Sequence, residues 1–233
     1  MERIPEETEL MIGLDECRSY SDSIKNKIKH LFFFTPLLAL LNLIKKNSSG
    51  YLANIGCGNC EYDIEICKSF EDIIIDAYDG SEEMVKIAEE RINSSEFKNR
   101  INLKKQDIRD ITKKYEMIFS TNTLHHFHNP NDFWLSIKKM SNNKTKILIM
   151  DIIRPESNKI INDIVTNSAQ SLDETFINSY TNSLKSAFTI EEIKTQLINN
   201  NLYNLTVERH ELPINPNRKG SNSLSLVFIY GKV

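Results

Sequence analysis

The feature that most constrains the fold is a regular alternation of short apolar runs with longer amphipathic segments after residue 50. The apolar runs are Tyr51–Ile55, Asp72–Tyr78, Ile101–Asp107, Met117–Ser120 and Lys146–Ile153. The segments at 60–70, 81–92 and 133–140 that separate them have helical character. Strands that are apolar on both sides and alternate with helices predict an α/β fold, with a mostly parallel sheet covered on both faces. Such a sheet binds ligands at the carboxyl ends of its strands.

The two flanks of this core complete the expected architecture. Residues 1–48 have apolar residues at helical spacing and predict an N-terminal helical layer. Toward the other end we expect a helix at Ile190–Asn200 and two strands at Leu205–Leu212 and Leu224–Gly231. The connection between these strands is too short for a crossover helix, so we expect them to be antiparallel.

The chain shows neither an internal repeat nor a linker, which predicts a single domain over residues 1–233. Within it we expect a helical layer, a cofactor-binding core, a helical insertion that serves as a lid, and a C-terminal helix with a β-hairpin. Their expected ranges are 1–48, 49–155, 156–188 and 189–233.

Composition and charge exclude several classes of protein. The chain has 29 Lys and Arg against 32 Asp and Glu, without a basic stripe, so nucleic acid is not indicated. All four cysteines lie in the first third, which argues against a secreted disulfide framework and predicts reduced thiols in the cytoplasm. The start, MERIPEETELM, has acidic residues where a signal peptide needs basic ones. The apolar run Leu31–Ile44 is shorter than the roughly 20 residues that span a bilayer, so we expect a buried helical segment and no membrane span.

A glycine-rich turn, NIGCGNC (Asn54–Cys60), lies directly between the first predicted strand and the first predicted helix. Glycines at this place let the backbone turn tightly and approach a ligand, with helix N–H groups beyond it. A plain tight turn is the alternative interpretation.

Acidic residues follow two further strands. Asp79 comes 23 residues after Gly56, where an acid can bind ribose hydroxyls, and Asp76 is the competing candidate. Asp107 follows the third strand and precedes Ile108, a pair suited to the amine and the ring face of an adenine. The set predicts a ligand that carries an adenosine.

Five stretches in this order resemble the class I S-adenosylmethionine-dependent methyltransferases. They are YLANIGCGNC, IIIDAYDGSEEMVKIAEERI, QDI, YEMIFSTNTLHHFHNP and KILIMDIIRPES, and the resemblance covers about Tyr51–Ser157. The flanking RIPEETELM and TNSLKSAFTIEEIKTQL are similar to a bacterial subgroup of small members of unassigned substrate. The resemblance implies a Rossmann-like fold, with a seven-stranded sheet whose last strand is antiparallel.

The resemblance also implies a set of residues that bind S-adenosylmethionine. Gly56, Cys57 and Gly58 would contact the methionyl part, and Asp79 the ribose. The other members of the implied set lie beside the ribose, the adenine and the methyl end: Tyr20, Asn54, Gly80, Ser81, Met84, Asp107, Ile108, Thr121 and Asn122.

This sequence departs from the family pattern at two positions of the turn. Asn54 stands where the family has an acid that helps to bind the cofactor's amino group, and Cys60 replaces the third small residue. An asparagine still accepts a hydrogen bond but lacks the charge, so Asn54→Asp is expected to tighten binding if this role is right.

Methyl transfer needs no dedicated nucleophile, because the sulfonium is an excellent leaving group and catalysis can rest on positioning and exclusion of water. An oxygen or nitrogen acceptor can still require a base. His125 and His126, in LHHFH after the fourth strand, are our candidates, and His128 lies beside them. The alternative is that they pack against or cap a helix.

The candidates for contacts with the methyl acceptor are Arg154, Asn182, Ser183 and His210. Arg154 could hold an acidic group of the acceptor or form an ion pair with Asp151, and His210 could face the acceptor or be merely hydrogen-bonded. For Asn182 and Ser183, in the predicted lid, core packing is the alternative.

The leading prediction is a methyltransferase that acts on O or N, or on C, of a small molecule or a peptide. The first alternative is a methyltransferase-like protein that binds a ligand or a partner without catalysis. The second is an NAD(P)-dependent oxidoreductase, which the sequence disfavours because Glu61 stands where the last glycine of the dinucleotide motif belongs. A zinc site is not expected, because Cys57 and Cys60 have no second pair at ligand spacing.

Overall fold

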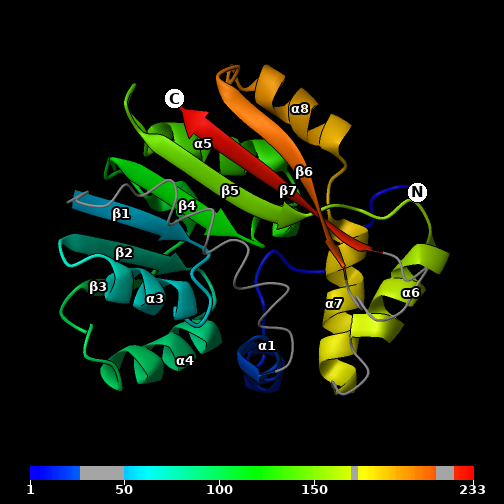
Figure 1. Ribbon diagram of the computed structural model, residues 1–233, viewed down its shortest axis with the longest axis horizontal. Coiled ribbons are helices and arrows are strands. Elements are labelled where there is room, and N and C mark those ends of the chain that lie inside the picture. Colours follow the sequence, from blue (N-terminus) through cyan, green and yellow to red (C-terminus); the bar gives the residue numbers. More distant parts are fainter. Residues whose placement is uncertain (27–49, 169–172, 214–222) are drawn as a thin grey trace.

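The computed structural model describes residues 1–26, 50–168, 173–213 and 223–233 of the chain. In this part of the chain a seven-stranded sheet has the order β3-β2-β1-β4-β5-β7-β6 (Figure 1). The strands, in chain order from β1 to β7, are Gly50–Ile55, Ile73–Asp79, Ile101–Lys105, Met117–Thr121, Lys146–Ile152, Leu205–Pro213 and Ser223–Lys232. The strands β1 to β5 pair in parallel, and β7 runs antiparallel to both β5 and β6. The structure therefore confirms the predicted sheet, including its antiparallel last strand.

The strand order reverses between β1 and β4, the two strands that begin the two halves of the sheet. At such a switch point the connections leave in opposite directions and open a crevice at the carboxyl ends of the strands. The site described below lies at this crevice.

Helices cover both faces of the sheet, as Figure 1 shows. One face packs against α3 (Glu61–Ser69) and α4 (Glu82–Asn93), and the other against α5 (Pro130–Lys139) and α8 (Ile190–Asn199). The indole of Trp134 on α5 is fully buried and donates to Gln196 of α8 at 2.9 Å. The two clusters of buried side chains, one on each face, hold the strand ends in fixed positions.

Local sequence signals explain where these helices start. The Ser81 hydroxyl caps α4 by accepting the N–H of Met84, and Glu82 and Glu83 follow in the first turn. Thr189 and Glu192 form a reciprocal capping box at the start of α8.

Three further helices lie beyond the strand ends: α1 (Leu14–Asn26), α6 (Asn158–Ser168) and α7 (Glu174–Ser186). The helices α6 and α7 come from the segment expected to form a lid, and α7 packs against α1 (Figure 1). Short 3-10 turns follow β3 at Ile108–Asp110 and β4 at Leu124–His126.

The structure differs from the expected N-terminal helical layer. Residues 1–13 form neither helix nor strand, and helix begins only at Leu14, after Gly13 in a left-handed conformation (φ 98°). This segment hydrogen-bonds to distant backbone, for example from Ile4 N to Lys185 O at 3.1 Å. The predicted helical run Leu31–Ile44 lies outside the described residues.

Among the helices of the described residues, none has the length and apolar character needed to cross a bilayer.

Candidate functional site

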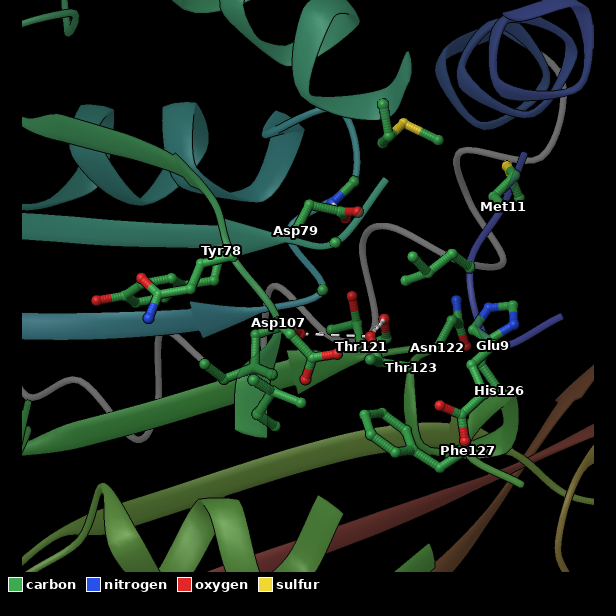
Figure 2. A pocket seen from close by; sticks show the side chains of 18 of the residues that line it. Glu9, Met11, Tyr78, Asp79, Asp107, Thr121, Asn122, Thr123, His126 and Phe127 are labelled. Atoms are coloured by element: carbon green, nitrogen blue, oxygen red, sulfur yellow. Dashed lines mark hydrogen bonds between the residues drawn. The ribbon is translucent and has the colours of Figure 1, made fainter. Parts of the chain in front are cut away.

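A cavity of about 800 Å³ opens at the carboxyl ends of β1, β2 and β4 (Figure 2). We call it the strand-end cavity. It is lined by the turn after β1, the end of β2, the loops after β3 and β4, Tyr20 of α1, Met84 of α4 and residues 9–11. In Figure 2, Asp79 and Asp107 lie on one side of this cavity, and Met11 and His126 on the other.

Most of the residues implied to bind the cofactor line this cavity together. They are Tyr20, Gly56, Gly58, Asp79, Gly80, Met84, Asp107, Ile108, Thr121 and Asn122, and His126 joins them. Three others, Asn54, Cys57 and Ser81, do not line it.

The two glycines of the turn have different roles. Both have left-handed φ angles, 67° at Gly56 and 54° at Gly58. A Cβ at Gly56 would meet the side chain of Thr123 at 2.2 Å, whereas a Cβ at Gly58 would meet nothing within 4 Å. Gly56 is therefore required by packing, and Gly58 presents bare backbone to open space where a ligand can approach.

Asp79 ties the glycine turn to the end of β2. Its carboxylate accepts the N–H of Gly58 and the N–H of Ser81, both at 2.9 Å. Burial raises the pKa of Asp79, while these two backbone hydrogen bonds oppose the shift. The carboxylate is thus held rigidly at the cavity, and each oxygen keeps a lone pair that can accept from a ligand.

Asp107 lines the cavity from the loop after β3, at the start of a 3-10 turn. Its carboxylate pairs with the guanidinium of Arg109, at 2.9 Å from Nε and 2.7 Å from Nη2, and this hydrogen bonding lowers its pKa. The competing candidate Asp76 is buried instead under hydrogen bonds from Asn102, Lys113 and Tyr115. Asp76 does not line the cavity.

Asn122 follows β4 with a φ of 51°, in the left-handed region that asparagine tolerates better than most residues. Its side-chain oxygen is buried and has no hydrogen-bond partner among the described residues. A strained backbone with an unused acceptor at a cavity wall indicates a ligand contact.

Asn54 has a structural partner that the sequence did not indicate. Its side chain is buried and donates to Asp63 of α3 at 2.8 Å. Burial raises the pKa of Asp63 to about 7, although the hydrogen bond from Asn54 opposes this. The side-chain oxygen of Asn54 is buried without a hydrogen-bond partner among the described residues, so its predicted contact with the cofactor's amino group stays a prediction.

Cys57 and Ser81 have structural roles beside the cavity. Cys57 N–H donates to Tyr78 O at 2.9 Å, and Ser81 caps α4. The thiol of Cys57 is buried, and burial raises its pKa to about 11, which opposes a redox role that needs a thiolate.

Residues 3–11 form an extended strap across the strand ends, which we call the N-terminal strap. The guanidinium of Arg3 donates to the carbonyls of His125 and Phe127, at 3.0 and 2.9 Å. Glu9 accepts from the N–H of His128 at 2.8 Å, and a Leu10 methyl lies 2.6 Å from where a Cβ of residue 80 would be. The strap thus closes one side of the strand-end cavity, and sequence reasoning missed it.

His126 and Glu6 form the central contact of the strap, with Nδ1 and Oε2 2.6 Å apart. Burial opposes the charge of both groups, but their hydrogen bond and mutual attraction outweigh it. The pKa of Glu6 falls to about 2, and that of His126 rises. Each group therefore favours the charged form of the other. His128 is exposed and contacts Glu6 O at 2.7 Å.

His125 is almost fully buried and bound to Asp151 near the end of β5. Its Nδ1 lies 2.6 Å from Oδ1 of Asp151, and its backbone N–H donates to Oδ2 at 3.0 Å. Its Nε2 has no hydrogen-bond partner within the part of the chain that the structure describes. Asp151 is a residue of this site for which we had predicted only an ion pair with Arg154.

A second cavity of about 440 Å³ lies between α7 and the loop after β4, and we call it the α7 cavity. It shares Met11, Tyr20, Asn122 and His126 with the strand-end cavity, so the two spaces meet. Its remaining wall residues are His125, Ile152, Phe176, Ser179, Tyr180 and Ser183.

The residues predicted to contact the acceptor lie in different parts of the structure. Ser183 lines the α7 cavity and donates to Glu6 at 2.8 Å, whereas Asn182 is exposed at the rim of the strap. Arg154 is buried away from both cavities, where it donates to Ala187 O and Glu192. Its ion pair is with Glu192 and not with Asp151, and its position outside both cavities does not favour the predicted contact with the acceptor.

His210, which we predicted could face the acceptor, lies away from the site. It lies on the edge strand β6, packs on Phe228 with ring centroids 4.5 Å apart, and is 46% exposed. This position is outside both cavities, because the hairpin extends the sheet away from the crevice.

Glu6, His125 and His126 bring three potential metal ligands within 4.8 Å of one another. Two imidazoles and a carboxylate suit a divalent transition metal, and Asp151 would support His125 from behind. The cysteines, in contrast, are buried thiols without disulfides.

Comparison with known proteins gives a family and a set of related folds. A family model described as "Methyltransferase domain" matches residues 48–207. No curated protein matches the chain.

Solved structures share the fold at low sequence identity. The plantazolicin methyltransferase BpumL in complex with SAH is 16% identical with a TM-score of 0.68, over 94% of this chain and 91% of that one. A SAM-dependent methyltransferase from Aquifex aeolicus is 17% identical with a TM-score of 0.64, over 94% and 99%. Phosphoethanolamine N-methyltransferase 2 from Haemonchus contortus is 11% identical with a TM-score of 0.61, over 86% and 52%.

Proposed function

Since this chain belongs to the methyltransferase-domain family, we propose that it binds S-adenosylmethionine in the strand-end cavity and transfers the methyl group to an oxygen, nitrogen or carbon atom of a small molecule or a peptide. One observation carries this assignment. The rigid carboxylate of Asp79 and the bare backbone of Gly58 face the same cavity and are hydrogen-bonded to each other.

The residues at the cavity fit the parts of this molecule. The carboxylate of Asp79 has lone pairs left for ribose hydroxyls, and Gly80 and Met84 lie beside it. Asp107 and Ile108 offer a carboxylate and an apolar surface for the adenine. The buried oxygen of Asn122, which has no partner within the described residues, can accept a hydrogen bond from the amino group of the methionyl part.

The bound cofactor supplies a methyl group on a positively charged sulfur. The chain's own residues bind this donor, orient the acceptor and exclude water, which accounts for most of the rate in such a displacement. The N-terminal strap contributes to water exclusion because it covers one side of the cavity. His125 and His126 line the adjoining α7 cavity, where an imidazole nitrogen can take a proton from the acceptor.

Ligand binding gives a direct test. Saturating S-adenosylmethionine stabilises the folded state by about 2.7 kcal/mol at one hundred times its Kd, so the midpoint of thermal unfolding should rise. NAD should leave the midpoint unchanged. Stabilisation by NAD, or none by S-adenosylmethionine, would contradict the assignment. Transfer of a labelled methyl group to a cell extract then separates an enzyme from a non-catalytic binding protein.

A further inference from the structure

We infer that His125 is the general base of the reaction, and that the acceptor is a small uncharged aromatic molecule that presents a phenolic hydroxyl or a thiol to His125 in the α7 cavity. The inference rests on the proposed function, because it takes the methyl donor to lie in the strand-end cavity. It adds the residue that removes the proton and the chemical class of the acceptor.

The orientation of His125 favours a base. Its Nδ1 lies 2.6 Å from a carboxylate oxygen of Asp151, which can only accept, so Nδ1 carries the hydrogen. In a neutral imidazole the other nitrogen, Nε2, then has a free lone pair. The side chain is 3% exposed, and Nε2 finds no partner among the residues that the structure describes. A buried acceptor without a partner is costly, which indicates that a ligand donates to it.

His126 is the poorer base of the two. Its Nδ1 is already bound to Glu6, and this contact raises the pKa of the ring and favours its charged form. The other oxygen of Glu6 accepts from Ser183 and Ser186, and it lies 4.0 Å from Nε2 of His125. That distance is too long for a hydrogen bond but short enough to stabilise the imidazolium that forms when His125 takes a proton.

The α7 cavity places an acceptor between this base and the methyl donor. Tyr20, Asn122 and His126 line both cavities, so a molecule in the α7 cavity is adjacent to the methyl end of the strand-end cavity.

The walls of the α7 cavity define the acceptor class. Ile152, Phe176 and the rings of Tyr20 and Tyr180 supply an apolar and aromatic surface. Ser179 and Ser183 add hydroxyls on one side. The described lining residues include no lysine or arginine that could pair with a carboxylate or a phosphate. A flat, uncharged molecule with one polar group fits this environment.

The basicity of imidazole restricts the polar group further. A phenol ionises near pH 10 and a thiol near 8.5, so either carries a proton acidic enough to pass to a nitrogen base. Nε2 of His125 takes the proton from the oxygen or sulfur, which forms a bond to the methyl carbon as the bond from that carbon to the sulfonium breaks. The products are the methyl ether or thioether, neutral S-adenosylhomocysteine, and a protonated His125 that returns its proton to solvent.

The test compares His125→Asn with the matched variant His210→Asn, which lies outside both cavities. Asparagine can still donate to Asp151 from near the place of Nδ1 but lacks Nε2. The probes are labelled S-adenosylmethionine with 4-methylphenol, 4-methylthiophenol, toluene, benzoate or benzylamine. We expect transfer to the phenol or the thiol by the wild type and His210→Asn. In His125→Asn, kcat/KM should fall at least 100-fold, while the Kd of S-adenosylmethionine changes less than twofold.

Nitrogen NMR of labelled histidines gives a readout that a purely structural role of His125 would not change. At pH 8 the His125 signals, identified by their loss in His125→Asn, should show a protonated Nδ1 and an unprotonated Nε2. Adding 4-methylphenol or 4-methylthiophenol to the complex with S-adenosylhomocysteine should shift Nε2. A protonated Nε2, or no binding of either compound to that complex, would overturn the inference.

The remaining outcomes are also decisive. Full activity of His125→Asn with intact cofactor binding would overturn the role of His125 alone, whereas a wild type that fails to bind S-adenosylmethionine would overturn the proposed function itself. Methylation of benzoate or benzylamine only would overturn the acceptor class. Loss of transfer in EDTA, restored by Zn²⁺ or Mn²⁺, would show that Glu6, His125 and His126 hold a metal ion instead.

Discussion

The cofactor side and the acceptor side of the site are assembled in different ways. On the cofactor side, Asp79 is bonded to Gly58 and Ser81, 21 and 2 residues away, within one βαβ unit. On the acceptor side, Glu6 contacts His126 and Ser183, 120 and 177 residues away. The first is a local construction on rigid strand ends, and the second depends on the strap, a loop and α7 meeting in the folded chain.

This difference predicts that substitutions on the two sides have different effects. Substitutions on the cofactor side should remove donor binding, because the proposed groups there contact the donor directly. Substitutions on the acceptor side should leave donor binding largely intact and lower turnover or the stability of the strap. Four sets of substitutions test this division, beside the His125 experiment.

The largest effect is expected for Asp79→Ala. Loss of the carboxylate removes the proposed ribose contacts, each worth roughly 1.5–3 kcal/mol as a hydrogen bond to a charged group, and releases Gly58. We expect the affinity for S-adenosylmethionine, measured by calorimetry, to fall at least 100-fold. Asp72→Ala, an exposed position before β2, is the control. Unchanged affinity in Asp79→Ala would show that the ribose lies elsewhere.

Substitutions at the two glycines of the turn should have separate effects, one mainly on the stability of the fold and the other mainly on cofactor binding. Gly56→Ala brings a methyl against Thr123 in a left-handed conformation and should cost about 3 kcal/mol of the free energy of unfolding. Gly58→Ala meets open space, so it should cost only about 1 kcal/mol but weaken cofactor binding. Urea unfolding and calorimetry measure the two quantities. Equal losses of stability would contradict the different roles.

Glu6→Gln breaks the ion pair of the strap and should lower the free energy of unfolding by on the order of 2 kcal/mol at pH 5.5. The folded pKa of Glu6 is lowered to about 2, so its contribution is complete above about pH 4.5 and is lost as pH falls toward 2. The folded pKa of His126 is raised, so its contribution is complete below about pH 6.5 and is lost as pH rises through the raised value.

The stability difference between the wild type and Glu6→Gln should therefore peak between about pH 4.5 and 6.5 and shrink on both sides. Urea unfolding at pH 3, 5.5 and 8.5 measures it. Binding of S-adenosylmethionine should change only a few-fold. A difference that is independent of pH would mean that the pair does not hold the strap.

The smallest effect is expected for Asp63→Asn, which lies beside the glycine turn but outside the cavity. The folded pKa of Asp63 is raised to about 7, so this group favours folding less as pH rises from about 4 to 7. The variant should therefore be more stable than the wild type by about 1 kcal/mol at pH 8 and equal at low pH, with transfer unchanged. Asn54→Asp, in contrast, would place two carboxylates together and should destabilise the fold rather than tighten binding. Thermal unfolding between low pH and pH 8 measures the stability change in both variants, Asp63→Asn and Asn54→Asp.

The difference between the cofactor side and the acceptor side also explains which parts of the site the sequence could predict. Strand periodicity, the glycine turn and the acids after β2 and β3 are short-range signals, and the cavity residues from Gly56 to Asn122 follow from them. The mostly parallel sheet followed as well, because β and α segments alternate without a break.

The acceptor side could not be predicted because its contacts span most of the chain. Nothing near Glu6 or Asp151 in the sequence indicates that each will bind a histidine. The structural partners of Arg154 and Asn54 could not be predicted for a related reason, since the direction of each side chain depends on a helix that packs beside it. Those helices are α8 for Arg154, through Glu192, and α3 for Asn54, through Asp63.

The strap also sets the order in which a newly synthesised chain can become active. Arg3, Ile4 and Glu6 leave the ribosome about 180 residues before their partners at Ser183, Lys185 and Ser186. At roughly 5–20 residues per second, on the order of ten seconds pass before these contacts can form. The donor-binding half can condense early in translation, and a nascent chain that stops short of α7 would carry a complete nucleoside pocket with no chamber for the molecule to be methylated.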